Sequence, residues 1–280
     1  MAERYFILNA DDFGMSADFN RAVLYGCEKG LLKSASLCAN GAAFDNAVNE
    51  ILPECPSLGV GVHLNIIEGK SLTRCHLLTD DNGNFNKGYL ALIFKSKNKE
   101  FQKQIEAEFR AQIEKVMRFV KPDHLDSHFH THAIPEIFKI TVKLAKEYNI
   151  PYIRTQHENF YIVPGLLKHL NFKYPANIIK SLLLNYFTSI NRKTLSLSEI
   201  KTNDYLLGAL YSGMMDNLTI ECGLEALPEE NAVTEAFIHP CKYNSNVNNH
   251  KVKEFLITQN RELENKIRGL GFEITNYKQL

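Results

Sequence analysis

The chain has 280 residues, of which 32 are Lys or Arg and 32 are Asp or Glu, so its formal net charge is zero. This balance, together with the lack of any basic stretch that also holds aromatic residues, argues against a nucleic-acid partner. No apolar run is long enough to cross a bilayer, and the acidic pair at residues 11–12 comes too early for a signal peptide, so we expect a cytoplasmic protein without a membrane partner.

The first predicted unit is a buried strand followed by a helix. Apolar strand-forming residues occupy positions 5–9, and two carboxylates, Asp11 and Asp12, follow at the end of this strand. Ser16 is a suitable N-cap for the next segment, which has helical spacing and ends at Gly30. The beginning of the chain therefore predicts one strand-helix unit with two acidic groups between its elements.

The same alternation continues to the end of the chain. Further strands are predicted at 32–39, 58–65, 124–128, 151–154, 206–211, 233–238 and 272–275. Helices are predicted at 44–52, 99–120, 134–148, 177–191, 218–227 and 251–268. About seven repeats of strand and helix are typical of a parallel sheet with helical crossovers.

The length and the absence of a Gly-, Ser- or Pro-rich linker favour a single domain over residues 1–280. Two inserted segments depart from the alternation, at about 66–98 and 155–203. The first is predicted to be a long loop with a turn at its middle. The second contains the unusually apolar helix 177–191, which we interpret either as additional core or as a dimer contact or lid. The six cysteines show no CxxC spacing and are predicted to be unpaired thiols.

Residues 124–132 read His-Leu-Asp-Ser-His-Phe-His-Thr-His and hold four imidazoles and one carboxylate. A strand continued through this run would put all five groups on one face, because side chains alternate along a strand. Crowded imidazoles are costly unless they are neutralised or bound to a metal. This run is therefore the strongest indication of a metal site in the sequence.

Other groups that bind metals or move protons stand at the ends of separate predicted strands: Asp11 and Asp12, His63, His128 and His239. A closed barrel brings such strand ends to one rim more readily than an open sheet does. We therefore predict an α/β fold of the distorted TIM-like (β/α) barrel type, with about seven parallel strands.

The pattern predicts a catalytic metal site formed by Asp12, His63 and His128. One carboxylate and two imidazoles leave positions on a divalent ion open for water and substrate. Asp11 is a candidate general base, but in an ideal strand it points away from Asp12, so the backbone must leave extended geometry there. His239 is a candidate proton donor to the leaving group.

These residues resemble the YdjC-like carbohydrate deacetylases, which include the chitooligosaccharide deacetylases. The resemblance is carried by Asn9-Ala-Asp-Asp-Phe-Gly14, Gly59-Val-Gly-Val-His-Leu-Asn65, His124-Leu-Asp-Ser-His128 and His239-Pro240. It implies a distorted barrel, a homodimer, and metal-dependent removal of the acetyl group from an N-acetylglucosamine unit of a small sugar or chitooligosaccharide. It also implies the metal on Asp12, His63 and His128, the base on Asp11 and, more loosely, the proton donor on His239.

The chain departs from the family pattern in three places. Phe129 stands where another His is common, Cys241 stands where Gly or Ala is frequent, and the segment 155–203 is poorly matched. The metal is either Mg²⁺, as often described for similar proteins, or Zn²⁺, which two imidazoles suit better.

Two other classes of function remain open. A metal-dependent phosphoesterase would use similar ligands, with Arg154 and Lys242 as the convenient cations for a phosphate. A non-catalytic sugar-binding protein would need aromatic platforms, for which Phe129, Tyr211 and Tyr243 are candidates, and would not need Asp11.

Overall fold

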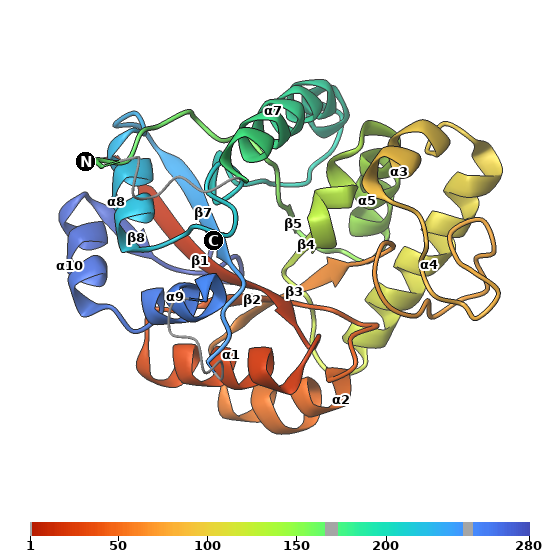
Figure 1. Cartoon of the computed structure of the whole chain (residues 1–280), viewed down its shortest axis with the longest axis horizontal. Coiled ribbons are helices and arrows are strands. Elements are labelled where there is room, and N and C mark those ends of the chain that lie inside the picture. The colour runs from red at the N-terminus through yellow and green to blue at the C-terminus, as the bar shows by residue number, and fades with distance from the viewer. Residues whose placement is uncertain (1, 166–172, 243–248) are drawn as a thin grey trace.

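The computed structural model describes residues 2–165, 173–242 and 249–280 (Figure 1). Its strands are β1 (Arg4–Phe13), β2 (Ser34–Leu37), β3 (Gly59–Leu64), β4 (His124–Ser127), β5 (Tyr152–Ile153), β6 (Tyr205–Leu207), β7 (Ala232–Ile238) and β8 (Phe272–Ile274). Every pair of these strands that is hydrogen-bonded is parallel, and the order across the sheet is β5-β4-β3-β2-β1-β7-β6. The eighth strand, β8, pairs with the first residues of β1.

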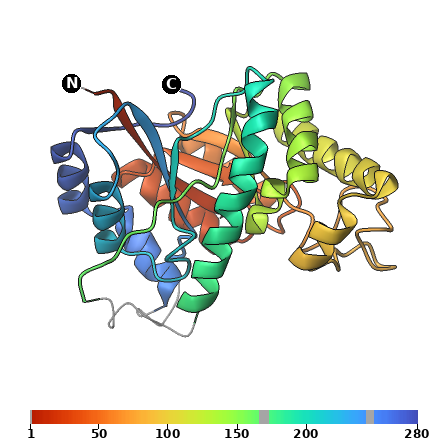
Figure 2. The same cartoon turned by 90° about the horizontal axis from the view of Figure 1, so that it is seen from above.

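Helices surround this sheet. The α-helices are α1 (Ala17–Lys29), α2 (Phe44–Asn46), α3 (Tyr89–Lys95), α4 (Lys99–Met117), α5 (Pro135–Glu147), α7 (Tyr174–Ser196), α8 (Asn217–Glu225), α9 (His250–Ile257) and α10 (Arg261–Gly269). Shorter helical turns are the π-helix η1 (Ala47–Ile51) and the 3₁₀-helices η2 (Leu52–Glu54) and η3 (His128–Ala133). Figure 2 shows α3 and α4 extending to one side of the sheet, away from α10 on the other. None of the helices within the described ranges combines the length and apolar character that a membrane crossing requires.

The sheet curls so that its two outer strands approach each other. Ile153 of β5 donates a backbone hydrogen bond to Lys201, and Leu206 of β6 donates one of 2.7 Å to His157, just after β5. These bonds bridge the gap between the first and last strands of the sheet order. The curled parallel sheet confirms the predicted α/β fold of the TIM-like type.

Strand β1 lies at the centre of the sheet and carries the first acidic pair. Its residues from Phe6 to Phe13 are all buried, as expected for a parallel strand covered on both faces. It pairs with β7 on one side and with β2 and β8 on the other. Because all strands are parallel, their carboxyl ends, including that of β1, meet at one end of the sheet.

Two predicted elements are wrong. The segment 66–98 is not loop throughout, because α3 lies in it and two isolated bridges, Lys70 to Asn84 and Thr79 to Phe85, fold its first part into a hairpin-like turn. The helix predicted over 251–268 is two helices. The side chain of Asn260 accepts a hydrogen bond from Leu263 N and caps a new start, as Asn favours.

Helix α7, within the inserted segment 155–203, packs against α5 and η3 (Figures 1 and 2). Its buried face mixes polar and apolar residues. Among the polar ones, Asn191 donates a hydrogen bond to Ala133 O, and Thr188 accepts one from Gln156 N. Several apolar residues of the same helix are exposed: Ile179, Leu182, Tyr186 and Ile190. Leu184 and Phe187 of α7 belong to the hydrophobic core, so the helix adds to the core on one face and leaves apolar residues exposed on the other.

Candidate metal centre and the surrounding pocket

The two neighbouring carboxylates at the end of β1 both lie at the site because the backbone leaves extended geometry there. Asp12 has a φ angle of 63°, in the left-handed region that Asp adopts more readily than most side chains. Gly14, with φ of 89°, continues the turn. This confirms the expectation that Asp11 and Asp12 can serve one site only if the backbone leaves extended geometry there.

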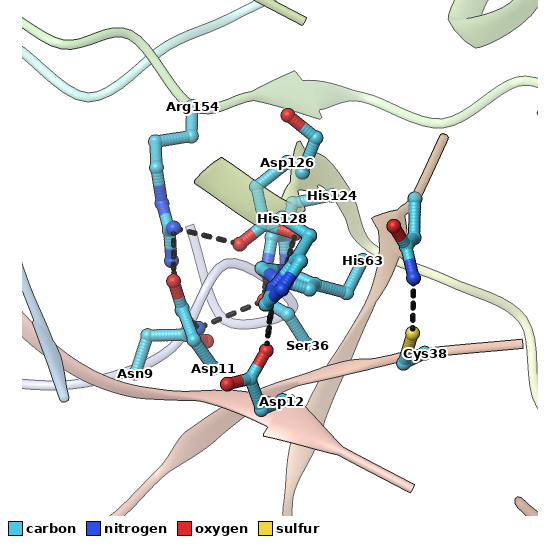
Figure 3. Close-up of polar contacts among 12 residues, drawn as sticks. Asn9, Asp11, Asp12, Ser36, Cys38, His63, His124, Asp126, His128 and Arg154 are labelled. Carbon is cyan, nitrogen blue, oxygen red and sulfur yellow. Dashed lines mark hydrogen bonds and ion pairs between the residues drawn. The ribbon is translucent and has the colours of Figure 1, made fainter. Parts of the chain in front are cut away.

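Asp12, His63 and His128 meet although they come from β1, β3 and η3 (Figure 3). Asp12 Oδ1 lies 2.9 Å from His128 Nδ1 and 3.5 Å from His63 Nε2. One candidate ligand atom from each residue lies within 4.8 Å of the others, and all three side chains are buried. The geometry thus brings together the three residues that the sequence singles out as metal ligands.

The donors around this point fit a divalent cation. Within the described residues, Asp12 Oδ1 and His63 Nε2 are buried and have no partner in hydrogen-bonding geometry, an arrangement that a metal ion would satisfy. Burial lowers the pKa of His63, but Asp126 and Asp12 outweigh this effect and raise it to about 10. Burial likewise raises the pKa of Asp12, yet the adjacent imidazoles of His128 and His63 hold it well below its ordinary value. The local field therefore favours positive charge at this point.

Asp126 orients His63 for this role. Its Oδ1 lies 2.9 Å from His63 Nδ1, which leaves Nε2 facing Asp12. A carboxylate on the second ring nitrogen fixes the tautomer and ring orientation of a metal-binding histidine.

Arg154 forms a buried cluster with three carboxylates that the sequence did not indicate. Its side chain is fully buried, and its guanidinium contacts Asp11 at 2.7 Å, Asp126 at 2.8 Å and Glu235 at 2.6 Å. Two parallel hydrogen bonds join it to the two oxygens of Asp11. Burial lowers the pKa of Arg154, but the three carboxylates raise it well above its ordinary value, so it stays charged. A charged residue, Glu235, within the apolar run of β7 was a sequence signal that could have indicated such a cluster.

His239 also reaches the pocket, from the end of β7. Its Nδ1 lies 3.5 Å from Glu254 Oε2, and its ring packs edge-on against Phe237. Burial lowers the pKa of His239, but Glu254 and Asp12 outweigh burial and raise it. The structure therefore places a readily protonated imidazole beside the carboxylates of β1.

The remaining histidines of the run 124–132 do not share one face, and that prediction is wrong. Extended geometry ends at Ser127, and Phe129 and His130 have φ angles of 53° and 55°. His132 bonds to Arg154 O and Ser127 Oγ and is a buried structural residue.

His124 lies deeper in the barrel, with Nε2 3.0 Å from Ser36 Oγ. Among the four imidazoles of the run, His128 alone contacts Asp12 within the described part of the chain.

A pocket of about 280 Å³ opens over these groups. It is lined by Asp11, His63, Ser127, His128, Phe129, His130, Asn177, Lys180, Ser212, Phe237 and His239. Asn177 and Lys180 come from α7, the helix for which the sequence left a lid as one interpretation without indicating these residues. Burial lowers the pKa of Lys180 to about 8. One wall of the pocket is therefore supplied by the inserted segment 155–203.

The inserted segment 66–98 contributes as well. Glu68 Oε2 lies 3.0 Å from His128 Nε2, although the side chain of Glu68 is largely exposed. Sequence reasoning did not single out Glu68, because a lone Glu in a loop carries no recognisable pattern.

Several residues proposed for the rival functions are not available to a ligand. Arg154 is surrounded by carboxylates, and Lys242 lies over the ring of Tyr25. Tyr211 is fully buried and cannot be a sugar platform, whereas Tyr243 lies outside the described residues. Phe129 is the one candidate aromatic among these that the structure describes at the pocket.

Comparison with known proteins shows to which family this chain is related. A profile of the family described as YdjC-like protein matches residues 5–268. A carbohydrate deacetylase from Clostridium beijerinckii is 30% identical over 277 residues, which cover 98% of this chain and 99% of that protein. A carbohydrate deacetylase from Brevibacillus brevis is 40% identical over 147 residues, which cover 52% of this chain and 57% of that protein.

A solved structure from Enterococcus faecalis V583 has a similar fold. The protein is described as a candidate cellobiose-phosphate cleavage protein, and it superposes with a TM-score of 0.77 over 99% of both chains. At 20% sequence identity, this likeness concerns the fold alone.

Proposed function

Because the chain belongs to the YdjC-like protein family, we propose that it is a metal-dependent carbohydrate deacetylase. The substrate we propose is a small sugar or chitooligosaccharide that contains an N-acetylglucosamine unit. The observation that carries the proposal is the buried cluster of Asp12, His63 and His128, in which Asp12 Oδ1 and His63 Nε2 lack hydrogen-bond partners among the described residues. This cluster lies beside Asp11, which lines the pocket and is bound by Arg154. The relatives named carbohydrate deacetylase support this assignment.

Asp12, His63 and His128 would hold one divalent ion, either Mg²⁺ or Zn²⁺. When bound, such an ion would polarise the acetyl carbonyl and make a water molecule easier to deprotonate. The two imidazole donors favour Zn²⁺ or a similar transition metal over Mg²⁺. Asp126, through His63 Nδ1, would keep the ligand geometry fixed.

Asp11 would act as the general base. It would accept a proton from the water whose oxygen attacks the acetyl carbon, and the C–N bond of the amide would then break to give acetate and a free amine. Arg154 donates hydrogen bonds to both oxygens of Asp11 and thereby fixes the orientation of the carboxylate. The Asn9 side chain donates a further hydrogen bond of 2.8 Å to Asp11 Oδ1.

His239 would supply the proton that the departing amine needs. Its raised pKa, caused by Glu254 and Asp12 against the opposing effect of burial, favours the protonated imidazole. Glu254 also accepts a hydrogen bond from His239 N, so the residue is held at both its backbone and its ring. This arrangement is suited to general acid catalysis.

One experiment separates the three candidate functions. Purified protein loaded with Zn²⁺ or Mg²⁺ is incubated with N-acetylglucosamine, its oligomers and a panel of sugar phosphates, and both acetate and phosphate are measured. Acetate release alone supports the deacetylase. Phosphate release would favour the phosphoesterase, and binding without either product would favour the sugar-binding protein. The expected homodimer and the single domain over residues 1–280 stay predictions, which light scattering and limited proteolysis of the same sample test.

A further inference from the structure

Phe129 is an exposed aromatic side chain at the mouth of the pocket, between two buried histidines. It is 61% exposed, whereas its neighbours His128 and His130 are 8% and 5% exposed. Its ring lies 4.6 Å from that of His128, at an interplanar angle of 80°. A large apolar side chain directly beside the candidate metal ligands is therefore left in contact with solvent.

The backbone at this point is strained as well. Phe129 and His130 occupy the left-handed region in succession, which is unfavourable for bulky side chains and persists only where the surroundings enforce it. Here His128 is held by Asp12, and the His130 ring packs 4.9 Å from that of Phe237. The two histidines thus fix the backbone, and the fixed backbone directs Phe129 outward.

The size of the pocket indicates what Phe129 contacts. At about 280 Å³, the pocket lies at the lower end of the range for ligand sites, so an oligosaccharide would extend beyond its mouth. The acetylated sugar must sit inside, near Asp12 and Asp11, and its neighbour in the oligomer would then lie at the rim, beside Phe129.

We propose that Phe129 is a stacking platform for the sugar ring next to the one that is deacetylated, and that it makes the enzyme prefer oligosaccharides over the monosaccharide. The apolar C–H face of a pyranose matches the flat face of a phenyl ring, and the contact would remove exposed apolar surface from water. This inference rests on the proposed deacetylase function. It concerns a residue that differs from the common family pattern, where a His is usual.

The first test compares Phe129→Ala, Phe129→Leu and Phe129→Tyr on the monosaccharide and the disaccharide of N-acetylglucosamine. Ala and Leu should raise KM for the disaccharide by about fivefold to tenfold, the size expected for one lost aromatic stacking contact. Tyr, which keeps the flat ring, should retain the wild-type KM. For all three variants kcat, metal content and the KM for the monosaccharide should stay within twofold of wild type.

The second test needs no turnover and uses the fact that the chain contains no Trp. In the Asp11→Asn background, Phe129→Trp introduces a single indole whose fluorescence should change as the disaccharide is added. The matched control is Phe119→Trp, at a position that is 49% exposed and lines a surface hollow with Leu58 and Val60. These residues lie at the amino ends of β3 and β4, opposite the metal centre, so the control should be silent.

The outcomes separate this inference from the proposed function. If calorimetry shows that the disaccharide binds while the indole fluorescence of the Phe129→Trp variant stays constant, or if Phe129→Ala keeps the wild-type KM for the disaccharide, the platform is wrong and the deacetylase stands. If Leu restores what Ala loses, the contact is general apolar contact and not stacking, which also overturns the inference. A protein that neither binds nor deacetylates these sugars would overturn both proposals.

Discussion

Two groups of buried charge border the same pocket and are built in opposite ways. Around Arg154, three carboxylates lie within hydrogen-bonding distance of one guanidinium, and each is held by at least one further contact. On the α7 wall, no carboxylate lies within 4.0 Å of the Lys180 amino group among the described residues. The nearest acid that influences Lys180, Glu158, accepts hydrogen bonds from the backbone N–H groups of Gly208 and Leu210 instead.

The pKa values follow from this difference. Burial opposes charge in both groups, but near Arg154 the carboxylates outweigh burial and raise its pKa. Near Lys180 burial prevails and lowers the pKa to about 8, and burial raises the pKa of Glu158 to about 7. The Arg154 cluster already has its hydrogen-bond partners and keeps its geometry with or without a ligand. The half-buried Lys180 ammonium has no carboxylate partner among the described residues, so it gains most when a ligand supplies hydrogen-bond acceptors. We therefore interpret the Arg154 cluster as a rigid group that holds Asp11 and Asp126 in place before substrate binds, and Lys180 as a substrate contact.

The largest expected effect comes from removing the ion beside the Arg154 cluster. Purified protein should contain close to one divalent ion per chain, and chelation should abolish acetate release, because the proposed water activation depends on the ion. Addition of Zn²⁺ or Mg²⁺ should restore activity, and the more effective metal identifies the preferred ion. Elemental analysis and acetate assays on the same samples check this, and full activity of metal-free protein would contradict the site assignment.

The next test separates the neighbouring carboxylates of β1. Asp12→Asn should weaken metal binding and lose activity with it, since Asp12 would supply charge directly to the ion. Asp11→Asn should retain the metal and lose turnover by roughly a hundredfold to ten-thousandfold, as expected for a lost general base. The measurements are metal content and acetate release for each variant. If Asp11→Asn loses the metal and Asp12→Asn keeps it, the two roles are reversed.

Saturation of the Arg154 cluster predicts a large effect on stability. Arg154→Met leaves three buried carboxylates without their common cation and should lower the free energy of unfolding by about 3–5 kcal/mol. The matched control is Arg110→Met, which removes a partly exposed arginine that pairs with Glu106 and Glu147 on the surface. That change should cost less than about 1 kcal/mol. Urea unfolding of both variants measures the difference. Equal losses in the free energy of unfolding would show that the buried Arg154 cluster stabilises the fold no more than a surface ion pair does.

The sequence was informative where chemistry follows a strand and uninformative where partners meet across the fold. Asp12, His63 and His128 each stand at the end of an apolar run, and parallel topology alone brings such ends together. Arg154 also ends a strand, but its partner Asp11 is 143 positions away, and nothing local to either residue indicates the pair. The prediction that the histidines of residues 124–132 share one face failed because of local backbone geometry. Two left-handed residues after Ser127 end the alternation of side chains on which that prediction depended.

Lys180 was outside the reach of sequence reasoning as well. It lies on a helix in an inserted segment, and only the packing of α7 against α5 and η3 turns its side chain toward the pocket. The prediction of this helix relied on its apolar residues, and several of them lie on its exposed face. Its buried polar face, which borders the site, has no distinguishing motif.

The smallest expected effects concern Lys180 and its proposed contact with the substrate. Lys180→Met should raise KM for the sugar by roughly tenfold, as for the loss of a hydrogen bond from a charged donor, while kcat and metal content stay close to wild type. Lys143→Met is the control, because Lys143 is exposed and pairs with Glu106 away from the site. Steady-state kinetics of both variants test this prediction, and an unchanged KM for Lys180→Met would show that Lys180 does not contact the substrate.

The same substitution should also change how stability depends on pH. Burial lowers the pKa of Lys180 to about 8 in the folded protein, whereas the unfolded chain retains an ordinary value of about 10.4. Between these values the unfolded state binds more protons than the folded state, so the free energy of unfolding contributed by Lys180 rises with pH. Lys180→Met lacks this rise, and since it also removes a positive charge that favours ionised Glu158, both effects act in the same direction. Urea unfolding at pH 8 and pH 10 should therefore show wild type gaining stability relative to the variant, and parallel curves would mean that Lys180 is paired in solution.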